Sequence, residues 1–141
     1  MKLKLITFLA ILLLVLSACS NDSSKDKAET ENVDAEGKKF RIVPTTVALT
    51  MTLDKLDLPI VGKPTSYKTL PKRYDDVPEV GQPMAPIVEA VKQVNPTHVL
   101  SVDTIKEEMK PFYKQLGMKG EYYDYDSIDG MEKSITRLGE Q

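Results

Sequence analysis

The sequence predicts an α/β fold, with a small, mostly parallel sheet flanked by helices. Two observations support this prediction. From Phe40 onward, short strand-like runs alternate with helix-like runs, and the clearest strand, residues 97–102 (THVLSV), lies between two helical patterns. In such sheets, ligands bind outside the carboxyl ends of the strands. Loops that follow strands are therefore expected to face the binding site, and loops that precede strands to face away.

The first strands and helix are predicted within residues 41–62. Arg41-Ile42-Val43 forms the first strand, and residues 45–56 form the helix that follows it. Residues 58–62 (LPIVG) are predicted as a second short strand, closed by glycine. Residues 65–76 are rich in Pro, Lys and Tyr and are expected to form a loop.

A third short strand is predicted at residues 78–81, followed by a helix that begins at Pro86. Proline fits the first helical position because its missing N–H costs nothing there. An apolar stripe at helical spacing continues to Val94, and Asn95-Pro96 ends the helix. The strand at 97–102 comes next.

The last part of the chain repeats the alternation. Residues 104–116 form a helix with Gly117 as its stop, and Pro111 is expected to kink or break it. Residues 122–125 (YYDY) are predicted as the last strand. Residues 128–138 form the final helix, with Ser127 or Asp129 as its cap.

The first 18 residues have the features of a signal peptide. Lys2 and Lys4 precede an apolar run, residues 5–16, which is too short to span a membrane as a helix. Cys19, the single cysteine, follows Leu-Ser-Ala, which is typical of a bacterial lipoprotein. We expect cleavage before Cys19 and a lipid on its sulfur, which would anchor the protein to the extracytoplasmic face of the cell membrane. The alternative is a free cysteine after an uncleaved anchor helix.

The chain is then divided into residues 1–18 (signal), 19–39 (lipidated cysteine and flexible tether) and 40–141 (one folded domain). Residues 20–39 are polar and charged, a composition that does not favour a packed core. The signal holds two of the 19 basic residues, so 17 remain against 21 acidic residues, a net charge of −4. This balance argues against nucleic acid as a partner.

Few residues suggest catalysis. The chain has one histidine, no Gly-rich phosphate loop and no nucleophile elbow, so an enzyme is not expected. His98 stands at the start of its predicted strand, away from the expected site, and is interpreted as a surface or edge histidine.

Three groups of residues are candidates for ligand binding. Met84 lies in a loop stiffened by Pro83 and Pro86, and its soft thioether suits copper(I) or haem iron, although packing is the commoner role for methionine. Unpaired amides at Thr45-Thr46-Val47 could hold an anion, or simply mark a capped helix. Tyr67 could pack on a flat ring, and Lys68 could meet a carboxylate.

Several motifs resemble the haem receptor lipoproteins of the iron-regulated surface determinant system in Gram-positive bacteria. They belong to the metal-chelate substrate-binding proteins of ABC importers. The more specific motifs are Pro64-Thr65-Ser66-Tyr67-Lys68 and Gly81-x-Pro83-Met84, and the likeness extends from about Arg41 to about Gly139. The resemblance implies that Met84 is an axial ligand of haem iron, that Tyr67 and Lys68 lie near the haem propionates, and that the Val47 amide meets a propionate.

The resemblance also implies a Rossmann-like lobe within a larger architecture. Receptors of this type have two lobes joined by a long helix, and the second lobe supplies an axial histidine that His98 does not match. The chain is therefore interpreted as an amino-terminal lobe, whether a fragment, a split gene product or a truncated reading frame. We expect it to capture haem as transported ligand and to deliver it to an ABC permease, with haem-donating surface proteins as possible sources. The alternatives are a receptor lobe for another iron chelate, such as a ferric siderophore, and a non-binding remnant that docks on a partner.

Overall fold

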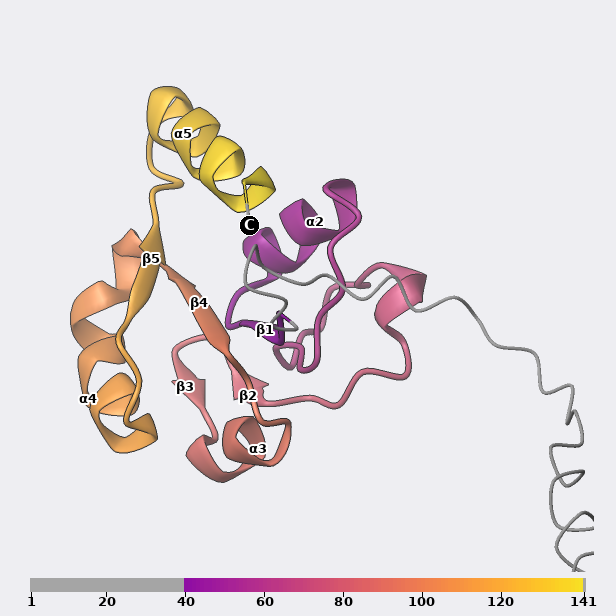
Figure 1. The fold of residues 1–141 in the computed structure, drawn as a ribbon, viewed down its shortest axis with the longest axis vertical. Helices are drawn as coiled ribbons and strands as arrows, with labels where there is room; N and C mark the ends of the chain where they lie inside the picture. Colours follow the sequence, from indigo (N-terminus) through magenta and orange to yellow (C-terminus); the bar gives the residue numbers. More distant parts are fainter. Residues whose placement is uncertain (1–39, 141) are drawn as a thin grey trace, which may run out of the picture.

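The computed structural model describes residues 40–140 and confirms the α/β prediction. Three parallel strands form the main sheet in the order β1 (Ile42–Pro44), β4 (His98–Val102) and β5 (Glu121–Tyr123) (Figure 1). Ile42 pairs with His98, and Leu100 pairs with Glu121. The predicted strands at 41–43, 97–102 and 122–125 correspond to these three, with shifts of one or two residues at their ends.

Helices pack on both faces of the sheet and create two hydrophobic cores. Alternate side chains of β1 and β4 point to opposite faces, so Ile42 and Leu100 lie in one core while Val43 and Val99 lie in the other. The first core is completed by helices α2 (Val47–Lys55) and α5 (Ile128–Gly139), and the second by α3 (Val88–Gln93) and α4 (Lys106–Leu116). Residues 40–140 also contain two 3₁₀ turns, η1 (Lys72–Tyr74) and η2 (Asp103–Ile105).

The helix ends follow local capping chemistry. The Thr46 hydroxyl accepts a hydrogen bond from the Leu49 amide at the start of α2, and the Ser127 hydroxyl accepts one from the Gly130 amide at the start of α5. Gly117 ends α4 in the left-handed conformation, with φ of 77°. Pro111 does not break α4, because it lies on the exposed side of the helix, where the carbonyl it leaves unpaired can meet water.

The predicted strand at 58–62 is wrong. This segment runs beside β1, where the Val61 amide donates to the Ile42 carbonyl at 2.9 Å, but no ladder forms. The only bridge nearby joins Lys63 to Glu79. Pro59 and Pro64 have no amide N–H to give to a ladder, which explains why the segment is extended without being a strand.

The prediction for residues 78–86 is also corrected. Instead of a strand of the parallel sheet, the chain forms an antiparallel hairpin of β2 (Gly81–Gln82) and β3 (Ala85–Pro86), with Pro83 and Met84 as its two-residue turn. Pro86 therefore belongs to β3 and not to a helix. The next helix, α3, begins only at Val88, after the Ile87 amide has donated to the Val80 carbonyl at 2.7 Å.

Cys19, the signal peptide and the tether lie outside the described residues. Among residues 40–140, no helix is both long and apolar enough to cross a membrane.

Candidate functional site

The loop that carries Tyr67 and Lys68 is fastened to the hairpin that carries Met84. The Val80 amide donates to the Lys63 carbonyl, and the Thr65 amide donates to the Gly81 carbonyl, both at 2.9 Å. The Thr65 hydroxyl also donates to the Glu79 carboxylate at 2.7 Å. These bonds hold residues 63–65 against the base of the hairpin. The two candidate ligand-binding segments therefore lie side by side at the surface.

Met84 occupies the tip of the hairpin. Its side chain is 61% exposed, so it does not fill a core. The sequence placed Met84 near the site by the rule for strands of a parallel sheet, whereas the structure presents it on a separate antiparallel hairpin. The outcome is nevertheless a thioether held at the surface by a short turn, with Pro83 restricting the backbone before it.

Tyr67 and Lys68 are both open to solvent. Tyr67 is 97% exposed, and Lys68 is also exposed. The Lys68 amide donates to the Ser66 hydroxyl at 2.9 Å, which closes a small turn and turns both side chains outward. A phenol ring and an ammonium group are thus presented together, with no tertiary packing over them.

The start of α2 offers free backbone donors. Because the Thr46 hydroxyl accepts from Leu49, the amides of Val47 and Ala48 have no acceptor among residues 40–140. Val47 is half-buried and Ala48 is exposed. Ala48 was not singled out from the sequence, although any residue at the second position of a capped helix offers the same free amide. These donors and the positive end of the helix favour an anionic group.

The α2 terminus is connected to the loop and hairpin through one intermediate segment. Val61 lies beside β1, whose carboxyl end leads into Thr45 and α2, while Lys63 and Thr65 lie beside the hairpin. No hydrogen bond between described residues joins α2 itself to the hairpin. The predicted site residues are thus carried by neighbouring segments, but only the Tyr67–Lys68 loop and the Met84 hairpin are directly fastened together.

His98 lies at the amino end of β4, as expected from the sequence. Its ring stacks at a tilt on Phe40, with 4.9 Å between the centroids, and its Nδ1 lies 2.9 Å from the Thr97 hydroxyl. This is the opposite end of the strands from α2. The described residues contain no cluster of His, Cys, Asp and Glu that could hold a metal ion.

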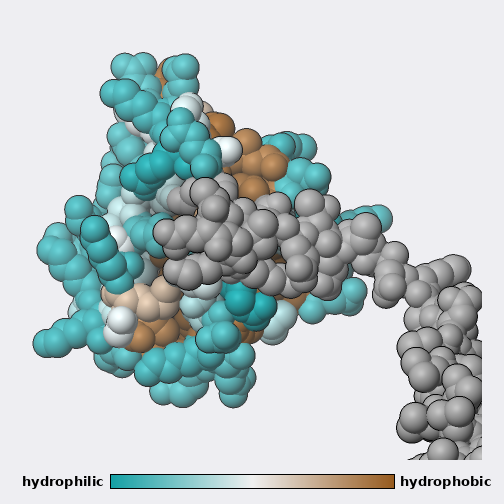
Figure 2. Space-filling model, in the orientation of Figure 1, coloured by the Kyte–Doolittle hydropathy of each residue, from teal (hydrophilic) through white to brown (hydrophobic). Residues whose placement is uncertain are grey.

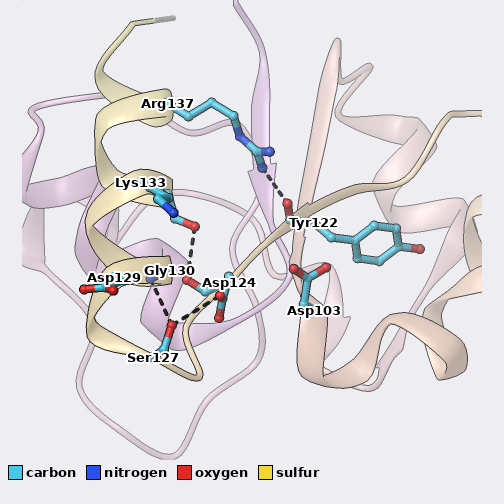
Figure 3. A pocket seen from close by; sticks show the side chains of 9 residues that line it. Asp103, Tyr122, Asp124, Ser127, Asp129, Gly130, Lys133 and Arg137 are labelled. Atoms are coloured by element: carbon cyan, nitrogen blue, oxygen red, sulfur yellow. Dashed lines mark hydrogen bonds between the residues drawn. The ribbon is translucent and has the colours of Figure 1, made fainter.

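A cavity of about 310 Å³ lies at the carboxyl ends of β4 and β5, and the sequence did not reveal it. Figure 3 shows Asp103, Asp124, Lys133 and Arg137 around it. Its polar groups are largely engaged in holding α5. The Arg137 guanidinium donates to the Tyr122 carbonyl and stacks 3.8 Å above the Tyr123 ring, while Asp124 accepts from the Asp126 amide. None of the predicted site residues lines this cavity.

The chain closely resembles curated haem uptake proteins. It is 65% identical over 139 residues to the high-affinity heme uptake system protein IsdE of Staphylococcus aureus. The match covers 99% of this chain but only 45% of that relative, so the chain spans less than half the length of the curated relatives it matches. No protein-family model matches the chain.

Solved structures give the same result. The crystal structure of S. aureus IsdE complexed with heme is 80% identical over 73% of this chain and 40% of that one, with a TM-score of 0.72. An ABC transporter substrate-binding protein from Listeria monocytogenes is 44% identical over 72% of this chain and 40% of that one, with a TM-score of 0.69. These similarities confirm the resemblance that the Pro-Thr-Ser-Tyr-Lys and Gly-x-Pro-Met motifs indicate.

Proposed function

We propose that this chain is the haem-capturing lobe of a substrate-binding lipoprotein that delivers haem to an ABC permease. The observation that supports this most strongly is the hydrogen bonding of the Tyr67–Lys68 loop to the Met84 hairpin, in a chain that is 80% identical over 73% of its length to a structure solved with haem. Haem needs a soft ligand for its iron and a cation for its propionates. The two segments would supply both groups on one side of the haem. The role is binding and not turnover.

Each site residue has a distinct task in this proposal. Met84 gives its thioether sulfur to one axial position of the haem iron. Lys68 pairs with a propionate, and Tyr67 packs on the porphyrin or donates its hydroxyl. The free amides at Val47 and Ala48 hold a propionate as anion donors. The apolar part of the porphyrin is removed from water as it settles on this face, which supplies much of the binding energy.

The described lobe offers only one axial ligand. The single histidine of the chain lies at the amino end of β4, so it cannot complete the iron coordination from this site. The second position is filled by water or by a group from another part of the receptor. Haem held by this lobe alone is therefore bound more weakly than haem held between two lobes.

The location follows from the amino-terminal sequence. A lipid on Cys19 tethers the lobe to the extracytoplasmic face of the cell membrane, and residues 20–39 provide reach from the membrane. Haem arrives from surface proteins that donate it and leaves through the permease.

A ligand titration separates haem from other iron chelates. Residues 20–141 contain six tyrosines and no tryptophan, so bound haem is detected by quenching of tyrosine fluorescence. Haemin is expected to quench saturably, whereas a ferric siderophore leaves the signal unchanged. Saturable quenching by the siderophore without quenching by haemin would contradict the proposal.

Replacement of Lys68 tests the propionate contact. Lys68→Ala is expected to weaken haemin binding about two- to fivefold, because an exposed ion pair contributes up to about 1 kcal/mol. The same change at Lys114, an exposed residue of α4, is the matched control and should leave the affinity unchanged. Equal effects of both substitutions would indicate a general charge effect and not a propionate site.

A further inference from the structure

The β2–β3 hairpin exposes more apolar surface than the Met84 side chain alone. Ala85 in β3 is exposed, and Ile87, directly after the hairpin, is 54% exposed. Tyr67, on the loop hydrogen-bonded to the base of the hairpin, is almost fully exposed. Figure 2 shows hydrophobic surface in the part of the molecule where Figure 1 places β3. Exposed apolar side chains that gather on neighbouring segments are typical of a contact surface.

The described lobe reaches only one face of a haem bound to this surface. Haem iron has two axial positions, one on each face of the flat ring. Met84 serves one of them, while His98 lies at the amino end of β4. The other exposed thioethers, Met51 and Met131, lie on helices α2 and α5, and in the described part of the chain neither helix is hydrogen-bonded to the hairpin. The second axial position therefore needs a ligand from outside this lobe.

The shape of haem allows two copies of the same surface to bind it. Both propionates extend from one edge of the ring. A rotation of 180° about an axis that lies in the ring plane and passes between the propionates exchanges the two faces and the positions of the two propionates. Two copies of the lobe related by this rotation form a symmetric pair. Each copy then presents one Met84 to one axial position and one Lys68 to one propionate, so two cations meet two carboxylates.

We infer that two copies of the chain hold one haem between them, with a Met84 thioether from each copy on opposite sides of the iron. This inference rests on the proposed function, because it takes Met84 as an iron ligand, and it applies where no other part of a receptor covers the open face. Each copy removes one apolar face of the ring from water, against the exposed side chains of Ala85 and Ile87. The site is incomplete without the second copy.

The number of chains bound to each haem tests the inference. The full chain is kept in a non-ionic detergent, because residues 5–16 are apolar, and is added to a fixed, low concentration of haemin. The Soret absorbance is expected to reach its plateau at two chains per haem. Native mass spectrometry of the same sample should show a species of two 15.8-kDa chains and one haem, which forms only when haemin is added.

Three substitutions identify the side chain that joins the copies. Met84→Ala should lower the amount of the two-chain, one-haem species about tenfold or more, because both axial ligands are lost. Met131→Ala is the matched control and should leave that amount within about twofold of the unsubstituted chain, since Met131 is exposed on α5. Met84→His supplies another axial ligand and should restore the species with a different Soret maximum.

The inference and the proposed function fail in different ways. A plateau at one chain per haem, or a species of two chains and two haems, overturns the inference and leaves haem capture by one lobe standing. A two-chain, one-haem species that persists in Met84→Ala overturns it as well, because another group would then join the copies. No saturable Soret change in a folded sample of the full chain would overturn both the inference and the proposed function.

Discussion

At the scale of single residues, the exposure of Met84 and Tyr67 shows that neither side chain fills the core of the lobe. From the sequence alone, a methionine between two prolines is more often a packing residue. The structure leaves 61% of Met84 and 97% of Tyr67 exposed, although a core is close to both segments. Large apolar or aromatic side chains left open on neighbouring segments form a surface that a flat apolar ligand can cover.

Gly130 is required by the cap of α5. A Cβ at this position would lie 1.9 Å from the Asp124 carboxylate, which itself accepts from the Asp126 amide. Gly130→Ala is therefore expected to lower the free energy of unfolding by about 2 kcal/mol or more, measured by urea denaturation. Gly139→Ala, on the same helix with nothing within 4 Å, should leave stability unchanged or raise it by up to about 1 kcal/mol. Equal effects at both positions would show that helix propensity, and not the Asp124 contact, determines the change in stability.

Tyr74 should give the fold a dependence on alkaline pH. Burial raises the pKa of Tyr74 to about 12, and its hydroxyl donates to the Leu58 carbonyl at 2.6 Å. Because the folded pKa lies above the unfolded value near 10, this contribution is complete below pH 10 and is lost as the pH rises toward 12. The free energy of unfolding should fall by roughly 1–2 kcal/mol across this range on account of Tyr74. Tyr74→Phe should flatten that part of the profile, and an unchanged slope would contradict this assignment.

At the scale of elements, the β2–β3 hairpin is the part that the sequence predicted least well. Hairpins with two-residue turns are usually signalled by Asn-Gly or Asp-Gly, and Pro83-Met84 gives no such signal. Pro86 fits the first turn of a helix equally well, so its place in β3 was not foreseen. In contrast, β4 and α5 were predicted correctly, because a β-branched apolar run and a serine cap are local features.

Gly81 is needed for the hairpin to hold Met84 in place. Its φ is 107°, and a Cβ there would lie 2.8 Å from the Ile87 amide nitrogen, which must donate to the Val80 carbonyl. Gly81→Ala is expected to cost roughly 1–3 kcal/mol in urea denaturation and to change the absorbance spectrum of bound haem. Gln82→Ala, an exposed change on the same hairpin, should do neither. If Gly81→Ala left the haem spectrum unchanged, the hairpin would not be part of the haem-binding site.

At the scale of the whole molecule, the two cores form a scaffold that carries the exposed candidate segments. Helices cover both faces of the β1-β4-β5 sheet, and the loop and hairpin with Tyr67, Lys68 and Met84 lie outside it. The general α/β arrangement was predictable from alternation along the chain. The attachment of the loop to the hairpin was not predictable from the sequence. It depends on backbone hydrogen bonds between segments about 15 residues apart, as in the Thr65–Gly81 contact.

The chain spans less than half the length of the curated relatives it matches. It aligns with 45% of the S. aureus relative, and the site described here presents one face to a ligand. The account therefore concerns the proposed haem capture by the Met84 side of this lobe.

The central claim is that Met84 ligates haem iron, and a haemin titration of residues 20–141 followed in the Soret region tests it most directly. Met131→Ala is the matched control, because Met131 is also exposed but lies on α5. The account predicts a saturable Soret shift that Met84→Ala alters and Met131→Ala leaves unchanged. An identical spectrum in Met84→Ala, or no saturable shift in a sample shown to be folded by circular dichroism, would contradict it.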